Sequence, residues 1–306
     1  MASEITAALE MAGVERRHLL RSKVLGDYWA LTKPEVNFLI TTTTFAGFYL
    51  ACAIQPFPFM LLIHTLLGTL LVASGAGTLN QYIERHFDAQ MRRTARRPVA
   101  SGRIEPSHAF WFGISLSLAG TVYLALAAGG LASFLTAVTL LSYLFLYTPL
   151  KRKTPLCMLV GAFPGAMPPL IGWAAARGRL DPEAWVLYAM IFLWQFPHFM
   201  AIAWMYREDY RRARYLVLPD DELRDRFVVW QTMVPSLALI GVSLIPTING
   251  ESGLVYSVFA LILGSIFFYY GGSFAFSKSN DAARQLLAAS IVYLPAIFIL
   301  MVLDKQ

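Results

Sequence analysis

The chain has 306 residues, of which 57% are hydrophobic and only 14% are charged. Soluble domains carry about 25% charged residues, and disordered chains are rich in charge, so this composition excludes a long disordered protein and argues against a soluble enzyme. It is typical of a helical protein that crosses a membrane several times. The 25 Lys and Arg against 19 Asp and Glu give a net charge of +6, which we interpret as membrane topology, with no nucleic-acid partner.

Nine runs of 19 or more residues contain no Lys, Arg, Asp or Glu. A helix of about 20 apolar residues crosses the hydrocarbon core, and backbone groups in lipid must be hydrogen-bonded within their own segment. Each run is therefore predicted to be a transmembrane helix, which makes the fold class all-α. The runs are 36–54, 57–79, 109–128, 131–149, 157–175, 184–206, 227–247, 252–273 and 285–303.

The basic residues are distributed very unevenly between the two sides of the predicted bundle. Of the 25, 22 fall in the N-terminal segment and in the connections on its side. Basic residues accumulate on the inner side of a membrane, so the N-terminus is predicted inside and the C-terminus outside. We expect an inner tail at 1–35 without a signal peptide, one membrane domain at 36–303 and a short tail at 304–306. The two long charged connections, 80–108 and 207–226, are both predicted inside.

The first of these connections begins with a ladder of polar residues. Asn80, Glu84 and Asp88 are four residues apart and would line one face of a helix that continues the second span. Oxygen ligands of this kind suit Mg²⁺, which takes one or two carboxylates together with phosphate oxygens. Arginines follow, among them Arg93 and Arg97, and would bind the remaining phosphate charge. The alternative is a solvated helix end whose basic residues only set topology.

A second acidic cluster follows the sixth span at Arg207, Glu208 and Asp209. Its place after the sixth span resembles that of the first cluster after the second. We predict that the two acidic helix ends face each other and hold metal ions around one diphosphate, with a topological charge cluster as the alternative. The acids of the following loop are expected to be solvated, namely Asp220, Asp221, Glu222 and Asp225.

Three more side chains are candidates. Tyr147 ends the fourth span, where its ring would face a developing cation, and Lys151 follows within reach of phosphate. An interfacial aromatic with topological charges is the alternative. His198 lies inside an uncharged span, where a histidine is either functional or hydrogen-bonded to another helix. The fifth span carries six Gly and Pro residues between Gly161 and Gly172, which predicts kinks, close packing and a cavity wall.

At these residues the chain resembles the UbiA-type intramembrane prenyltransferases, and within them the branch that farnesylates heme B. The pattern runs from Asn80 through Glu84, Asp88 and Arg93 to Arg97-Pro98. Four further stretches agree, namely 31–35, 147–152, 165–173 and 194–210. The chain departs from the family where Glu84 replaces a frequent Asp and Cys157 replaces a frequent Asn.

The resemblance implies nine helices around a central cavity, and transfer of the farnesyl group of farnesyl diphosphate to a vinyl group of heme B, with addition of water. Heme O and diphosphate would be the products, Mg²⁺ would be bound with the diphosphate, and heme B would be a substrate rather than a cofactor. The implied metal ligands are Asn80, Glu84, Asp88 and Asp209. The implied diphosphate-binding residues are Arg93, Arg97, Lys151 and Arg207. Tyr147 would stabilise the allylic cation, and His198 is expected to bind heme.

Two alternatives stay open at this point. One keeps the reaction and changes the acceptor to a quinone-precursor aromatic acid or a chlorophyllide-like tetrapyrrole, against which His198 and the 194–210 stretch argue. The other is a transporter of an anion, which would show a pair of broken helices at the membrane midplane. The resemblance also implies a bacterial or a mitochondrial inner membrane, membrane lipid as surroundings, and a heme A synthase or terminal oxidase assembly partner. We favour the bacterial inner (plasma) membrane, because Glu4 and Glu10 make the N-terminal segment unlike a transit peptide, and we expect the charged loops at its cytoplasmic side.

Overall fold

The computed structural model describes residues 23–52, 56–219 and 221–306. Its described residues form helices joined by turns, with one isolated bridge between Ser252 and Lys305. The all-α prediction is therefore confirmed. The helices are α2 (Pro34–Ala51), α3 (Phe59–Asp88), α4 (Pro106–Ala127), α5 (Gly130–Leu141), a π-helix (Ser142–Tyr147), α6 (Thr148–Leu150), α7 (Cys157–Ala166), α8 (Pro168–Arg177), α9 (Pro182–Met205), α10 (Arg207–Arg212), α11 (Asp221–Ile248), α12 (Leu254–Ser277) and α13 (Asn280–Leu303).

Eight helical segments of the described chain are long and apolar enough to cross a membrane, and they coincide with the second to ninth predicted spans. The first predicted span corresponds to α2, which has 18 residues. Helix α2 is not among those eight segments, and it contains Glu35, Asn37 and four consecutive threonines, 41–44. The chain is thus a multi-pass membrane protein, and the total of nine spans stays a prediction.

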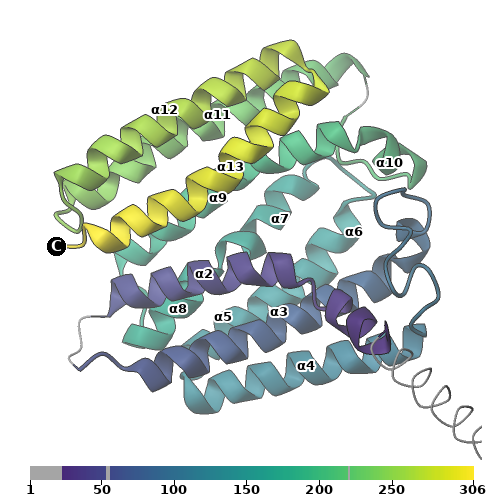
Figure 1. Ribbon diagram of the computed structural model, residues 1–306, viewed down its shortest axis with the longest axis horizontal. Helices are drawn as coiled ribbons and strands as arrows, with labels where there is room; N and C mark the ends of the chain where they lie inside the picture. Colours follow the sequence, from purple (N-terminus) through teal and green to yellow (C-terminus); the bar gives the residue numbers. More distant parts are fainter. Residues whose placement is uncertain (1–22, 53–55, 220) are drawn as a thin grey trace, which may run out of the picture.

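The helices are arranged in two groups (Figure 1). In one group α3 packs along α4 and α2 packs along α8, while in the other α11 contacts both α9 and α12. Helices α6 and α7 lie between the groups (Figure 1), and α7 packs against α9. Segments far apart in sequence are therefore brought to one central space, as the predicted arrangement requires.

The fifth predicted span is broken in the middle, as its Gly and Pro content predicts. Helix α7 ends at Ala166 and α8 begins at Pro168, so the span bends between them. A Cβ atom at Gly172 would lie only 2.0 Å from the carbonyl oxygen of Thr44, and one at Gly165 only 2.0 Å from the side-chain oxygen of Gln195. These glycines let α2 and α9 approach the broken span closely, so both the kink and the close packing are present.

The described part of the N-terminal segment is packed against the bundle. Residues 23–31 are helical, and Leu31 is fully buried in a small apolar cluster with Val99, Ile104 and Ala109. The inner tail at 1–35 stays a prediction, and its residues 1–22 lie outside the described chain. This packing holds the segment that leads into α2 beside the loop that follows α3.

Candidate active site

A cavity of about 640 Å³ lies between the two groups of helices. Apolar side chains of α2, α7, α8 and α9 line it, and charged side chains are concentrated at the C-terminal end of α3. Eight of the ten predicted site residues line it, namely Asn80, Glu84, Asp88, Arg93, Arg97, Tyr147, Lys151 and His198. The cavity therefore suits a long apolar ligand with a charged group at one end.

The predicted ladder lies on the last turns of α3 and is buried. Helix α3 extends to Asp88, nine residues beyond the predicted apolar run, because the ladder continues the same helical hydrogen bonding. The exposed fractions of Asn80, Glu84 and Asp88 are 1%, 5% and 1%. Buried carboxylates are costly unless they are paired, so their partners decide what this site can do.

Each ladder residue is bound by a different cation. Arg97 donates from one nitrogen to both oxygens of Asp88, at 2.9 and 2.8 Å. Lys151 donates to Glu84 at 2.8 Å. A third cation, Lys33, donates to the amide oxygen of Asn80 at 2.7 Å. Acids and cations therefore alternate at one end of the cavity, which is the arrangement that a metal-bound diphosphate would need.

Lys33 is a site residue that the sequence argument did not single out, although its Lys-Pro pair lies in one of the family-like stretches. It caps α2 in the left-handed conformation with a φ of 53°, which turns the chain so that the lysine lines the cavity. Burial and the nearby Arg97 guanidinium lower the pKa of Lys33 to about 7. A lysine held this way gains its charge readily when an anion arrives.

The second acidic cluster reaches the same region from α10. Asp209 is buried and accepts hydrogen bonds from the backbone N–H of Arg93 at 3.3 Å and from Arg212 at 2.8 Å. The structure thus brings the two acidic helix ends to the same loop, as expected. Asp209 itself does not line the cavity, while the adjacent Tyr210 does. Within the described ranges no three His, Cys, Asp or Glu side chains are grouped as a preformed metal site.

The aromatic side chains at the charged end come from the π-helix. A π-helix rotates its residues relative to an α-helix of the same length, and here both Tyr143 and Tyr147 line the cavity. The ammonium of Lys151 lies 4.6 Å from the centre of the Tyr147 ring, so the phenol ring already faces a cation. Gly161 allows this, because a Cβ there would lie 2.5 Å from that ring.

Arg207 is not brought to the cavity. Its guanidinium donates to the carbonyl of Trp204 at 2.7 Å and to Asn280 at 2.8 Å, and it lines a separate pocket. Arg93, in contrast, lines the cavity, stacks on Tyr206 at 4.7 Å and donates to the Tyr210 hydroxyl at 3.3 Å. The expectation that Arg207 contacts phosphate receives no support from this geometry.

His198 lies on the apolar wall of the cavity, stacked on Trp194 with 4.5 Å between ring centres. Its Nδ1 is 2.7 Å from the hydroxyl oxygen of Ser290, and that hydroxyl donates its hydrogen to the carbonyl of Leu287 at 2.6 Å. Because the serine has only one hydrogen, it accepts from the histidine, and Nδ1 carries the ring proton. Nε2 then has a free lone pair, the form in which a histidine binds a metal.

Tyr215 is a second residue that the sequence argument missed. Its hydroxyl is buried at the cavity. Burial and the nearby Glu84 carboxylate raise the pKa of Tyr215 far above its usual range, so the phenol keeps its proton. The Glu84 carboxylate is an acceptor beside this phenol, so Tyr215 belongs to the charged end of the cavity. The only sequence signal is an aromatic residue that closely follows the second acidic cluster.

Comparison with known proteins places this geometry in context. A sequence model of the UbiA prenyltransferase family matches residues 39–299. A protein from Solibacter usitatus named protoheme IX farnesyltransferase is 47% identical over 287 residues, covering 91% of this chain and 98% of that protein. A protein of the same name from Koribacter versatilis is 40% identical, covering 93% and 94%.

Solved structures share the fold at low sequence identity. A structure described as digeranylgeranylglyceryl phosphate synthase superposes with a TM-score of 0.73 at 15% identity, covering 92% of this chain and 98% of that one. A UbiA homologue from Archaeoglobus fulgidus bound to GPP and Mg²⁺ superposes with a TM-score of 0.62 at 14% identity, covering 90% and 99%. These likenesses establish the arrangement of the helices.

Proposed function

The chain belongs to the UbiA prenyltransferase family, and on that premise we propose that it transfers the farnesyl group of farnesyl diphosphate to a vinyl group of heme B, with addition of water, to give heme O and diphosphate. The observation that carries the proposal is the likeness, over more than nine-tenths of the chain, to relatives named protoheme IX farnesyltransferase. The cavity supports it independently, because it joins an apolar middle to an end where carboxylates and cations alternate.

The donor set at that end fits Mg²⁺ bound with a diphosphate. Glu84 and Asp88 are buried carboxylates that line the cavity, and Asn80 adds an amide oxygen. The buried Asp209 adds a third carboxylate next to them, where it contacts the backbone of Arg93. Such hard oxygen ligands suit Mg²⁺, which needs only one or two of them per ion when phosphate oxygens complete its shell. Mg²⁺ supplies positive charge to the leaving diphosphate, as the Archaeoglobus homologue bound to GPP and Mg²⁺ suggests.

The remaining cations are positioned for the phosphate oxygens. Lys33, Arg97 and Lys151 line the cavity and now bind Asn80, Asp88 and Glu84. Electrostatic groups fixed in advance around the developing charge are the largest source of stabilisation in reactions of this kind. When the C1–O bond of the farnesyl chain breaks, the electron pair leaves with the diphosphate, which these cations bind.

The acceptor half of the reaction takes place in the apolar part of the cavity. The terminal carbon of the heme vinyl group forms the new bond to farnesyl C1, which leaves a cation on the carbon next to the macrocycle. Water adds to that carbon and releases a proton, so no strong general base is required. Tyr147 faces the region where the allylic cation develops, and the Nε2 lone pair of His198 is available to the heme iron.

The direct test is conversion of heme B. Purified protein in lipid is incubated with heme B, farnesyl diphosphate and Mg²⁺, and the pigments are separated by chromatography. We expect heme O to appear, to be absent after chelation of the metal and to return when Mg²⁺ is added. Heme B replaced by 4-hydroxybenzoate tests the aromatic-acid acceptor. A prenylated benzoate without heme O would reject the heme acceptor but keep the prenyltransferase.

The cellular setting follows from the same proposal. We propose that residues 36–303 form one domain in the bacterial inner membrane, with the charged end of the cavity at the cytoplasmic side. The excess of basic residues in the connections of that side supports this orientation. Heme O carries a long farnesyl chain and would pass within the membrane to a heme A synthase or to a terminal oxidase during its assembly.

A further inference from the structure

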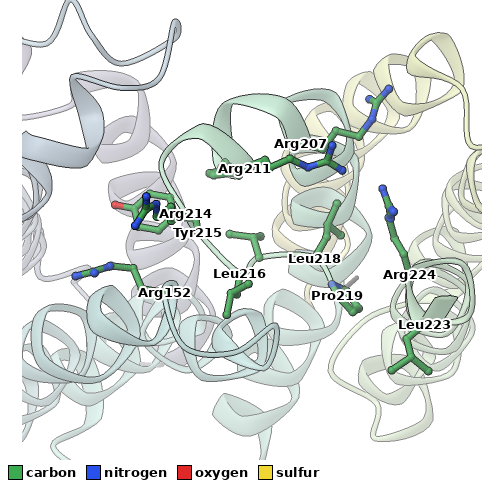
Figure 2. Close-up of a pocket in the computed structure, with 12 residues that line it drawn as sticks. Arg152, Arg207, Arg211, Arg214, Tyr215, Leu216, Leu218, Pro219, Leu223 and Arg224 are labelled. Atoms are coloured by element: carbon green, nitrogen blue, oxygen red, sulfur yellow. The ribbon is translucent and has the colours of Figure 1, made fainter. Parts of the chain in front are cut away.

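A second pocket, of about 950 Å³, lies between the end of α6, helix α10 and the start of α11 (Figure 2). We call it the arginine pocket, because five arginines line it together with apolar and aromatic side chains. No acidic side chain of the described residues is part of its wall. Its residues are Arg152, Arg207, Tyr210, Arg211, Arg214, Tyr215, Leu216, Val217, Leu218, Pro219, Leu223 and Arg224.

Four of these arginines form no ion pair with any carboxylate of the described chain. Arg152 stacks on Phe87, and Arg207 binds only the neutral partners given above. Arg211 and Arg214 are exposed in the pocket, and neither forms an ion pair with another described residue. Elsewhere on this face cations such as Lys278 are paired, in that case with Asp225. The positive charge of these four arginines is therefore not compensated by a carboxylate of the described chain, and it attracts anions.

The backbone at Arg214 gives a second reason to assign a role to the pocket. Arg214 has a φ of 54° at the end of α10, where the N–H of Tyr215 binds the carbonyl of Tyr210 at 2.8 Å. Glycine is the usual residue at such a helix end, because a side chain there is strained. Arg214 adopts this conformation with a long basic side chain, and Figure 2 shows that side chain on the same side of the pocket as Arg152.

The surroundings of the pocket match the level of lipid headgroups. The membrane segment of α11 begins at Leu223, so the pocket adjoins the end of a span. Leu216 and Leu223 expose 42% and 66% of their surface, and Trp230, two turns further along α11, exposes 67%. Exposed leucines next to arginines, with an exposed tryptophan nearby, are typical of the boundary between the hydrocarbon core and the lipid headgroups.

We propose that the arginine pocket binds the phosphate group of an anionic phospholipid of the inner leaflet, with Leu216 and Leu223 against its acyl chains. The N–H of Leu216 donates to the carbonyl of Lys151 at 2.7 Å, and Tyr215 lines both the pocket and the central cavity. A bound lipid therefore holds the connection that presents Tyr215 and Lys151 to the substrates. The effect of the lipid on how Tyr215 and Lys151 meet the substrates rests on the proposed function, whereas lipid binding itself does not.

Binding is tested with the full-length protein and a matched pair of variants. Arg211→Gln with Arg214→Gln removes two charges from the pocket, and Arg226→Gln with Arg284→Gln removes two exposed charges outside it. Native mass spectrometry measures the Kd for phosphatidylglycerol, with phosphatidylcholine as the neutral probe. We expect the pocket variant to bind phosphatidylglycerol about 30-fold more weakly, because each arginine contributes about 1 kcal/mol to the binding of an anionic lipid. The control variant should bind it as the wild type does. Equal weakening in both variants overturns the proposal.

Two competitors distinguish the source of the anion. Inorganic phosphate at millimolar concentration should leave phosphatidylglycerol bound, and displacement of the lipid would make the pocket a site for free phosphate. Heme B should also leave the lipid bound. Displacement by heme B, with a raised KM for heme in the pocket variant, would assign the arginines to the propionates and overturn the lipid proposal.

The consequence for turnover is measured separately in bilayers. Phosphatidylglycerol added to phosphatidylcholine nanodiscs should raise kcat of the wild type and of the control severalfold, and the pocket variant should respond little. If lipid binds as expected but no heme O forms in any bilayer, the proposed function fails and the lipid site stands. If heme O forms at the same rate at every lipid composition, the coupling through Leu216 and Tyr215 is wrong.

Discussion

In the described structure the cations of the candidate site bind carboxylates and one amide. During turnover the same cations would bind phosphate oxygens. Asp88 shows this most clearly, because Arg97 contacts both of its oxygens while the exposed fraction of the aspartate is 1%. A buried pair of this kind contributes little net stability but defines where each charge lies. Removing one partner leaves the other charge buried and unpaired, so individual substitutions should affect both turnover and stability.

For Asp88→Asn and for Asp209→Asn we expect turnover to fall by about 10²–10³, because each loses a carboxylate that would hold metal at the leaving group. Heme O formation at saturating Mg²⁺ measures the loss. Asp225→Asn is the control, since this exposed acid pairs with Lys278 away from the cavity. Near-normal turnover in either site variant would contradict the assignment.

For Lys151→Ala we expect the KM for farnesyl diphosphate to rise more than the KM for heme B. A lysine that holds phosphate in both the ground state and the transition state contributes mainly uniform binding. The buried Glu84 also loses its cation, so the melting temperature should fall as well. Lys153→Ala, at an exposed position two residues along, should leave both constants unchanged. A change in the heme constant alone would reject the role.

For His198→Ala we expect weaker heme binding and an altered heme absorption spectrum, while farnesyl diphosphate binds normally. The reason is the tautomer set by Ser290, which leaves Nε2 free for iron. Ser290→Ala should have a smaller effect of the same kind. It removes the acceptor that keeps the proton of His198 on Nδ1, but it leaves the histidine in place. If His198 serves only as a bridge between helices, both variants should lose stability alike and the spectrum of bound heme should stay the same.

At the scale of elements, close contacts between helix backbones hold the walls of the cavity. Helix α2 touches α8 at two glycines, and a Cβ at Gly47 would lie 2.2 Å from the carbonyl oxygen of Pro169. The contacted atom belongs to the backbone, so it cannot move aside as a flexible side chain does. Small residues are the usual means of close helix packing in membranes, where the hydrophobic effect does not hold helices together.

We therefore expect Gly47→Ala to destabilise the protein by about 1–3 kcal/mol, the usual cost of overpacking. Thermal unfolding in detergent should show a melting temperature several degrees lower. Gly241→Ala on α11 is the matched control, since a Cβ there meets nothing within 4 Å. It should be neutral or slightly stabilising, because alanine favours a helix over glycine. A stable Gly47→Ala protein would mean that α2 and α8 can separate without cost.

At the scale of the whole molecule, the uneven distribution of basic residues predicts the orientation in the membrane. Cysteine labelling tests it in a chain that lacks Cys52 and Cys157. Ser101→Cys and Asn249→Cys are exposed positions at opposite predicted sides. In spheroplasts with the outer surface accessible, a membrane-impermeant maleimide should label residue 249 and not residue 101. The reverse pattern would place the charged end of the cavity outside.

Much of this molecule follows from local patterns along the chain. Apolar runs predict helices because backbone groups in lipid must be satisfied within their own segment, and the described structure has helices at all nine predicted positions. The ladder of Asn80, Glu84 and Asp88 was predictable for the same reason, since spacing along one helix fixes which residues share a face. The break in the fifth span followed from its prolines and glycines.

The partners of these residues depend on contacts between distant helices, which no local pattern encodes. Lys33 meets Asn80 across 47 residues, His198 meets Ser290 across 92, and Asp209 meets the N–H of Arg93 across 116. Packing also directs Arg207 away from the cavity and brings Tyr215 to it, although both lie close to Asp209 in the chain. Periodicity defines the face that a helix presents, whereas the group that it faces is decided only when all the helices pack together.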